Sequence, residues 1–237
     1  MSLDELREQV CAANAALVTS GLVTLSFGNV SGIDRAAGMM VIKPSGVPYE
    51  TLRPDDLVGV DIASGTAVEG SARPSSDTPT HLALYRRYAE IGGVVHTHSA
   101  GASAWAQAGR PIPCLGTTHA DHFRGPVPVT RSLRPAELGP MYEAATGAVI
   151  VETLEAIRLG PLEMPAVLVR SHGPFTWGVD AADAVTNAIA LEAVATIAER
   201  TLLLYPDTRP IDDALLERHF GRKHGPGAYY GQVDRTS

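Results

Sequence analysis

The sequence predicts one three-layer α/β/α domain built around a mainly antiparallel central sheet. Its 237 residues suit one large domain better than two small ones. A composition with 45% hydrophobic and 19% charged residues is that of an ordinary globular core. Short strand-like runs joined by turn residues stand beside helical patterns, and such hairpins favour an antiparallel sheet covered by helices. We therefore expect a single domain over residues 1–237.

The first element is expected to be a helix. Ser2 and Glu5 have the spacing of a capping box, and apolar residues then recur at helical spacing. Gly21 is placed to end this helix. Short strand-like runs follow, each bounded by turn residues. The expected strands cover residues 22–25, 29–33, 39–42, 57–62 and 66–68.

Helices and strands then alternate along the chain. The run Asp77-Thr78-Pro79 predicts a helix start, because proline is favoured in the first turn. Asp180 is placed as the N-terminal cap of the longest helix. The further expected elements are strands over residues 94–98 and 166–169 and helices over residues 102–108 and about 181–204.

The segment from Pro206 onward differs from the rest of the chain. It contains proline, is rich in charge, and carries two adjacent tyrosines, Tyr229 and Tyr230, near its end. A mobile, solvated end is the plain interpretation. Adjacent tyrosines need a surface to pack against, however, and a neighbouring subunit is one candidate. We therefore expect residues 206–237 to pack at a subunit interface.

Charge and composition argue against several classes of protein. A net charge of −7 disfavours nucleic-acid binding, which requires basic faces. The two cysteines, Cys11 and Cys114, are too few for a disulfide framework and are expected to be buried small hydrophobes. The N-terminus lacks the pattern of a signal peptide, and no apolar run approaches the roughly 18 residues of a membrane span. We expect a cytoplasmic protein without membrane contact.

A pair of histidines carries the strongest functional signal. His96 and His98 end an apolar run, and on a strand they would share one face. Paired neutral imidazoles nucleate zinc, iron or copper sites, although such pairs also occur as satisfied sheet residues. His172 ends another apolar run and would add a third nitrogen, which leaves coordination positions open as in a catalytic site. Asp77 could be a fourth ligand, could orient a ligand, or could only cap its helix.

Three short loops offer groups suited to holding a phosphate. Lys43 adds a positive charge to one loop, and another loop precedes the helix at Thr78, whose N-terminal amides attract anions. Each loop alone is equally typical of a simple turn. Three of them beside a metal site favour a phosphorylated ligand. The candidate residues are Gly28, Asn29, Lys43, Ser45, Gly46, Ser75 and Ser76.

Other polar residues carry no distinctive local signal. Asp121 has the character of a surface residue or turn cap in a loop followed by glycine and proline. Glu143, Glu152 and Glu155 resemble solvated charges on a helix, and His81 is expected to be structural.

Together these motifs resemble the class II aldolase/epimerase superfamily, and within it the L-ribulose-5-phosphate 4-epimerases. The histidine motif alone would indicate only the superfamily. The Thr117–Asp121 loop and the Tyr-Tyr tail point to the epimerase branch. The resemblance covers nearly the whole chain. The matching segments are residues 28–31, 41–47, 73–78, 80–85, 92–99, 104–109, 115–121, 172–175, 222–226 and 228–232.

The resemblance implies a role for each candidate residue. It implies that Asp121 and Tyr230 form an acid–base pair contributed by the neighbouring subunit of a cyclic homotetramer. It also implies that the three loops hold the substrate and its phosphate. The bound metal is expected to be zinc, with manganese as an alternative. The implied metal ligands are Asp77, His96, His98 and His172.

The chain departs from the epimerase pattern at a few positions. These are Phe27, His122, Gly227 and residues 99–101. None of them is an expected metal ligand or acid–base group. They leave open the finer shape of the sugar pocket, and hence whether the enzyme serves arabinose or ascorbate catabolism.

The implied reaction interconverts L-ribulose 5-phosphate and D-xylulose 5-phosphate. The C4 hydrogen is not acidic, because C4 is not adjacent to the C2 carbonyl. Retro-aldol cleavage of C3–C4 is easier, since a metal ion stabilises the enediolate as a Lewis acid. Re-addition to the opposite face of the aldehyde inverts C4, and one acid–base group is needed on each face.

Two other functions remain open. An aldolase acting on a sugar 1-phosphate would keep the metal and phosphate groups, but we would expect glutamate at the position of Asp77. Persistent release of free fragments would favour that aldolase. A non-catalytic scaffold of the adducin type would be expected to lack metal ligands, and all the candidate ligands are present here.

Overall fold

The computed structural model describes residues 2–231 and contains one seven-stranded sheet within that range. The strand order is β4-β3-β2-β1-β5-β7-β6, and every neighbouring pair is antiparallel. The expected antiparallel sheet is confirmed. The strands are β1 (Asn29–Asp34), β2 (Met39–Ile42), β3 (Val58–Asp61), β4 (Ala67–Glu69), β5 (Gly93–His96), β6 (Ala166–Val169) and β7 (Gly173–Gly178).

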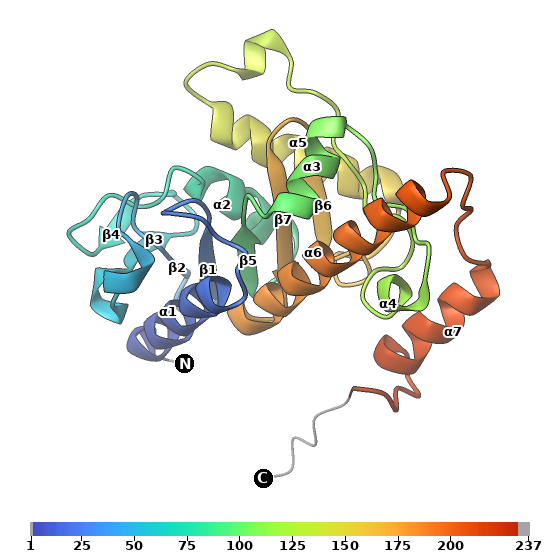
Figure 1. Cartoon of the computed structure of the whole chain (residues 1–237). Coiled ribbons are helices and arrows are strands. Elements are labelled where there is room, and N and C mark those ends of the chain that lie inside the picture. The colour runs from blue at the N-terminus through green and yellow to red at the C-terminus, as the bar shows by residue number, and fades with distance from the viewer. Residues whose placement is uncertain (1, 232–237) are drawn as a thin grey trace.

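Helices cover both faces of this sheet and complete the predicted three layers (Figure 1). Helices α1, α3 and α6 pack on one face, and α2 and α5 pack on the other. Helices α4 and α7 lie together at one side. The helices are α1 (Leu3–Thr19), α2 (Thr78–Arg87), α3 (Ala100–Ala108), α4 (Thr117–Ala120), α5 (Tyr142–Ile157), α6 (Ala181–Leu204) and α7 (Asp213–His224), with 3-10 turns at Tyr49–Thr51, Pro54–Asp56 and Pro135–Glu137.

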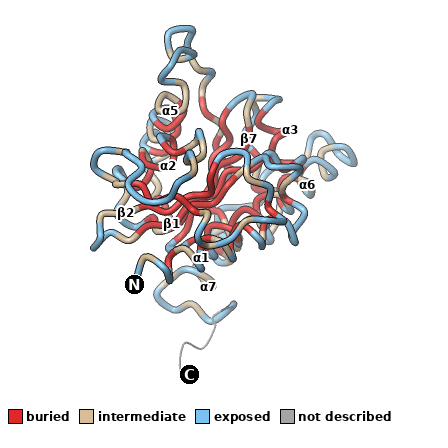
Figure 2. The backbone as a smooth tube through the Cα atoms, turned by 90° about the vertical axis from the view of Figure 1, so that its left-hand side faces the viewer, coloured by how far each residue is buried: buried red, intermediate tan, exposed pale blue. Residues whose placement is uncertain are grey.

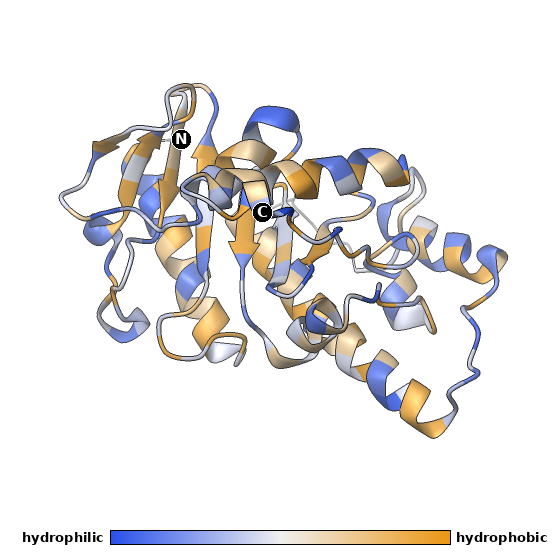
Figure 3. Ribbon diagram, turned by 90° about the horizontal axis from the view of Figure 1, so that it is seen from above, coloured by the Kyte–Doolittle hydropathy of each residue, from blue (hydrophilic) through white to orange (hydrophobic). Residues whose placement is uncertain are grey.

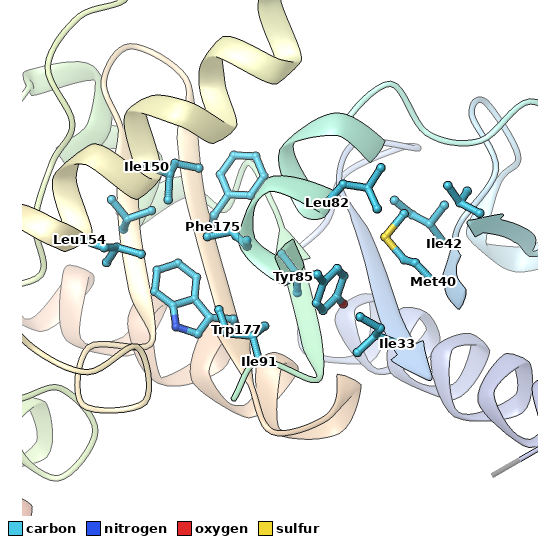
Figure 4. Packing of buried hydrophobic residues seen from close by; sticks show 14 of the residues in the cluster. Ile33, Met40, Ile42, Leu82, Tyr85, Ile91, Ile150, Leu154, Phe175 and Trp177 are labelled. Atoms are coloured by element: carbon cyan, nitrogen blue, oxygen red, sulfur yellow. The ribbon is translucent and has the colours of Figure 1, made fainter. Parts of the chain in front are cut away.

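Strand alternation divides the core into two sides. Successive side chains of a strand point to opposite faces, so Val94 packs toward α2 and α5 while Val95 packs toward α1 and α6. Figure 4 shows Phe175 and Trp177 of β7 packed with apolar side chains of α2 and α5. Apart from the exposed edge strand β4, the strands are mostly buried and largely hydrophobic (Figures 2 and 3). Apolar side chains and helices therefore cover both faces of the sheet, and the polar side chains of a site are expected at the ends of the strands.

The predicted caps of the long helices are confirmed. Ser2 and Glu5 form the reciprocal capping box of α1. The carboxylate of Asp180 accepts a hydrogen bond from the backbone amide of Asp183 at 2.8 Å and begins α6. By length and composition α6 could cross a bilayer, but half of its most apolar window is buried inside the protein. Its Glu192 carboxylate accepts the first amides of α3, so α6 is a core helix of this fold.

The expected strand over residues 22–25 is wrong. Leu22 is buried, but Leu25 is 76% exposed with φ of 55°, and the segment is an irregular turn that leads into β1. A short apolar run cannot distinguish a strand from a turn in which only one residue packs.

The segment after Pro206 is more ordered than a solvated end. It contains α7, which packs on α4 and carries the buried side chain of Phe220. The backbone amide of Ile211 also donates to the carbonyl of Cys114 at 3.0 Å. Residues 232–237 of the expected tail lie outside the described residues, and the predicted subunit interface stays a prediction.

Candidate active site

Three histidines converge where two strands end. His96 is the last residue of β5, His98 lies two residues beyond it, and His172 occupies the turn between β6 and β7. The ring centroid of His96 lies 4.8 Å from those of both His98 and His172. One ring nitrogen from each residue falls within 4.8 Å of the others. The three nitrogens that the sequence predicted are therefore brought together.

Hydrogen bonds orient two of these imidazoles. His96 Nδ1 donates to the carbonyl of Pro174 at 2.9 Å, which leaves His96 Nε2 with the free lone pair. His96 Nε2 lies 3.0 Å from His98 Nε2, so the lone-pair side of one ring faces the other. The Tyr142 hydroxyl lies 3.3 Å from His172 Nδ1. Such outer contacts are typical of histidines that bind a metal.

Burial keeps two of these imidazoles, those of His96 and His172, neutral. It lowers the pKa of His96 to about 3 and also lowers the pKa of His172. A neutral imidazole is the form that coordinates a metal. The charge state, the orientation and the spacing of the nitrogens therefore fit a divalent cation.

Asp77 lies beside the histidines at the start of α2. Asn29 Nδ2 donates to Asp77 Oδ2 at 2.7 Å and to Ser75 Oγ at 3.1 Å. Burial opposes the charged form of Asp77, but the neighbouring His96 and His81 and the Asn29 amide outweigh it, so its pKa is lowered. Among residues 2–231 the tight nitrogen group consists of the three histidines, and Asp77 contributes a carboxylate to the same cavity.

A cavity of about 430 Å³ surrounds these groups. It is lined by every residue that the sequence predicted for metal or phosphate binding. Five further lining residues were not predicted. The predicted residues are Gly28, Asn29, Lys43, Ser45, Gly46, Ser75, Ser76, Asp77, His96, His98 and His172, and the others are Ser26, Phe27, Pro44, Tyr142 and Glu143.

Lys43 lines the cavity, but its ammonium group donates to its own loop. Its side chain is buried, and its Nζ donates to the carbonyl of Val47 at 2.6 Å. The ammonium group also lies 4.7 Å from the ring centroid of Tyr49. Burial lowers the pKa of Lys43. In this arrangement Lys43 braces the loop that carries Ser45 and Gly46.

Gly28 is required by the geometry of its loop. Its φ is +87°, and a Cβ atom at this position would lie 2.6 Å from the carbonyl oxygen of His96. The loop backbone therefore runs directly against the end of β5. Phe27, the next residue toward the N-terminus, is half exposed with its ring centroid 6.0 Å from that of His98.

The sequence did not predict that Tyr142 and Glu143 line the site, because no capping residue marks the start of α5. Met141 occupies the N-cap and forms no side-chain hydrogen bond. A glutamate in the first turn of a helix is also stabilised by the helix dipole. This ordinary role gave no reason to expect that Glu143 lines the cavity. Only the packing of α5 on α2 reveals that the first turn of α5 faces the histidines.

Asp121 and Tyr230 lie near each other but do not line this cavity. Arg222 donates from Nε and Nη2 to the two carboxylate oxygens of Asp121 at 3.1 and 2.8 Å. The Arg222 guanidinium carbon lies 4.2 Å from the ring centroid of Tyr230. The expected acid–base pair is thus brought together just beyond the ends of α4 and α7, and neither residue lines the histidine cavity of its own chain.

Comparison with known proteins agrees with these features. A family model described as the class II aldolase and adducin N-terminal domain matches residues 8–198. Over 230 residues the chain is 56% identical to the L-ribulose-5-phosphate 4-epimerases UlaF of Salmonella typhi and Salmonella paratyphi A, which covers 97% of this chain and 100% of each relative.

Solved structures share the fold at lower identity. An L-fuculose 1-phosphate aldolase superposes with a TM-score of 0.77 at 22% identity, over 92% of this chain and 95% of that chain. The L-fuculose-1-phosphate aldolase of Thermus thermophilus gives a TM-score of 0.67 at 23% identity, over 86% of this chain and 99% of that chain. The predicted resemblance is confirmed, and the chain belongs to the class II aldolase/epimerase superfamily.

Proposed function

We propose that this protein is an isomerase that interconverts L-ribulose 5-phosphate and D-xylulose 5-phosphate by inverting C4. The observation that carries the proposal is the cavity in which three converging imidazoles face three loops suited to a phosphate. The 56% identity to curated 4-epimerases over nearly the full chain supports the same reaction.

A divalent cation, zinc in this proposal, would be held by His96, His98 and His172, with Asp77 at its side. It would supply Lewis-acid polarisation of the sugar's carbonyl end when bound. Family membership supports metal dependence, and the histidine cluster supports the location. The choice of zinc over manganese rests on the preference of zinc for imidazole nitrogen.

The chain's own loops would hold the phosphate of the substrate. Backbone amides around Gly28 and Gly46 and the hydroxyls of Ser45, Ser75 and Ser76 border one cavity. Asn29 Oδ1 is buried and has no hydrogen-bond partner among the described residues, which suits a group that meets a substrate hydroxyl. With the phosphate held, the aldehyde fragment could rotate without escaping.

Asp121 and Tyr230 would exchange protons at the substrate oxygens on opposite faces. Cleavage of C3–C4 turns the C4 hydroxyl into an aldehyde, so that hydroxyl must give up a proton. Re-addition to the other face then returns a proton to the new hydroxyl. Because neither residue lines the histidine cavity of its own chain, we propose that a neighbouring subunit supplies them in a cyclic homotetramer.

Exposed apolar residues support an oligomer. Leu203 and Leu204 at the end of α6 are 76% and 88% exposed, and Leu203 borders an apolar hollow with Trp105. Large exposed apolar side chains that cluster in this way mark interaction surfaces. A second copy of this chain is the partner that the shared-site proposal requires.

The direct test is product analysis with L-ribulose 5-phosphate. We expect D-xylulose 5-phosphate to accumulate to equilibrium, with metal-depleted protein inactive and zinc restoring turnover. Release of free glycolaldehyde phosphate and dihydroxyacetone at the rate of substrate loss would instead show an aldolase. The absence of both products from metal-loaded protein would contradict the proposal.

A further inference from the structure

Arg222 joins the two members of the proposed acid–base pair. Its guanidinium forms two parallel hydrogen bonds to the Asp121 carboxylate, at 3.1 and 2.8 Å. The face of the same group lies over the Tyr230 ring, with 4.2 Å from the guanidinium carbon to the ring centroid. The Arg222 carbonyl also accepts the backbone amides of Tyr229 and Tyr230 at 2.9 and 3.2 Å. Arg222 therefore contacts both partners with its side chain and also contacts Tyr230 with its backbone.

These contacts are partly withdrawn from water. The side chain of Asp121 is 13% exposed and that of Arg222 is 23% exposed, so solvent screens the pair less than an ordinary surface ion pair. Bidentate pairing combined with stacking is specific to arginine, because the guanidinium is planar and presents a fork of donors. A lysine ammonium could supply the charge but not the geometry.

The position of Tyr230 explains why such a link is needed. Tyr230 lies beyond the last residue of α7, in a segment without regular secondary structure. Its backbone alone cannot hold a side chain within the few tenths of an ångström that proton transfer requires. Asp121, by contrast, ends the short helix α4. Arg222 therefore connects Tyr230, which lies outside regular secondary structure, to Asp121 at the end of a helix.

Other polar groups also contact Asp121 or the residue that follows it. His219 Nδ1 lies 3.0 Å from Asp121 Oδ1, and His224 Nε2 donates to the Asp121 carbonyl at 2.8 Å. Lys223 contacts His122 on the adjoining loop, with 3.0 Å between Nζ and Nε2. His219 and His224 therefore hold Asp121 in place, and Arg222 in addition reaches from Asp121 to the Tyr230 ring.

We propose that Arg222 is the positioning residue that holds Asp121 and Tyr230 as one rigid acid–base unit. This inference rests on the proposed function, because Arg222 can position an acid–base pair only if Asp121 and Tyr230 transfer protons. Arg222 itself neither gains nor loses a proton in the reaction. Its contribution is to fix the distance between the Asp121 carboxylate and the Tyr230 phenol, so that the two groups can act on opposite faces of one substrate.

The test compares Arg222→Met, Arg222→Lys and Arg222→Ala in the metal-loaded, full-length protein. Arg218→Met is the matched control, because Arg218 is an exposed arginine one turn earlier on α7 that lies over Tyr229, 5.7 Å from its ring centroid. Circular dichroism, metal content and oligomeric state are measured for each variant. Steady-state kinetics are measured in both directions of epimerisation.

We expect Arg222→Met to lower kcat about 100-fold in both directions, the size of effect that a 1 Å misplacement produces. KM should change little, because the phosphate loops are untouched. Guanidinium ion should restore part of the activity of Arg222→Ala, and Arg222→Lys should fall between wild type and Arg222→Met. Arg218→Met should remain near wild type.

The pH profile gives a readout that a purely structural role would not move. Burial raises the pKa of Asp121, but hydrogen bonds from Arg222 and His219 outweigh burial and lower it. Loss of the guanidinium should therefore move the acidic limb of kcat to higher pH in Arg222→Met and leave it in place in Arg218→Met.

Tyr230→Phe separates this inference from the proposed function. If Tyr230→Phe abolishes epimerisation while folded Arg222→Met keeps kcat within about twofold, the positioning role is overturned and the proposed function stands. If Tyr230→Phe retains full activity, the acid–base assignment itself fails. Should Arg222→Met not fold, Arg222→Lys decides, because wild-type kcat in that variant would overturn the positioning role.

Discussion

His96 shows how single residues prepare this site. Its Nδ1 is committed to the Pro174 carbonyl, and its ring is stacked on Phe175 with centroids 4.1 Å apart. The remaining nitrogen therefore has one orientation, toward His98 and His172. A fixed orientation lowers the entropy lost when a cation binds.

The first prediction concerns His96→Ala, which removes one nitrogen from the cluster. We expect metal affinity to fall by more than the roughly 10- to 100-fold typical of outer-shell changes, and epimerisation to become undetectable. Metal content after dialysis against a chelator and the product assay measure these effects. His224→Gln, at an exposed histidine beside Asp121, is the control and should keep its metal. Stoichiometric metal and normal turnover in His96→Ala would show that the site lies elsewhere.

The second prediction concerns Gly28→Ala. The added Cβ would require an unfavourable φ of +87° and would lie 2.6 Å from the His96 carbonyl oxygen. We expect a loss of roughly 1–3 kcal/mol of unfolding free energy together with weaker substrate binding, because the strain falls on the phosphate loop. Urea unfolding and KM measure the two effects. Gly139→Ala is the control, since nothing lies within 4 Å of its Cβ. Equal stability of the two variants would contradict the close approach.

At the scale of helices and strands, the sequence predicted the elements that have a clear hydrophobic period or a clear capping residue. The helix after Ser2, the strand over residues 39–42 and the helix capped by Asp180 are confirmed. Strand β7 was missed because Gly173, Pro174 and Gly178 lack the composition of a strand. It forms because its neighbours β5 and β6 pair with both of its edges, which is information that no local window contains.

The same distinction applies to the candidate site. Spacing predicted the proximity of His96 and His98, because two residues of an extended chain share a face. Tyr142 could not be predicted, since its contact with His172 depends on how α5 packs against the sheet. The resemblance to the superfamily indicated roles for Asp121 and Tyr230 that local sequence did not suggest.

The third prediction concerns the cap of α6. In Asp180→Ala the Asp183 amide loses its 2.8 Å hydrogen bond, and the first turn of the helix should fray. We expect the unfolding free energy to fall by about 1 kcal/mol. Denaturant titration measures this change, with Asp207→Ala beyond the end of α6 as the control. A stability equal to that of Asp207→Ala would show that the cap contributes nothing.

Considered as a whole molecule, the protein should lose stability in mild acid. Burial lowers the pKa of His119 to about 4, and burial together with Lys223 lowers the pKa of His122 to about 4. An unfolded histidine titrates near 6.5, so the unfolded state binds more protons as the pH falls below that value. This stabilising contribution is present above about pH 6.5 and is lost as the pH falls toward 4.

The fourth prediction follows from this linkage. The free energy of unfolding from urea titrations should be lower at pH 5 than at pH 7.5, and the slope should be smaller in His119→Gln, which cannot take up that proton. The comparison uses the slope because the substitution also removes the hydrogen bond between His119 Nε2 and the Gly125 carbonyl. An unchanged slope in the variant would show that His119 does not contribute to acid sensitivity.

The central structural claim is that one working site combines the histidine cluster of one subunit with Asp121 and Tyr230 of another. Its most direct test is to mix two inactive variants, Tyr230→Phe and His98→Ala, under conditions in which subunit exchange is demonstrated. Hybrid oligomers would contain interfaces that pair an intact histidine cluster with an intact Tyr230. We predict that epimerase activity returns in the mixture while each variant alone stays nearly inactive. Demonstrated exchange without any return of activity would contradict the shared site.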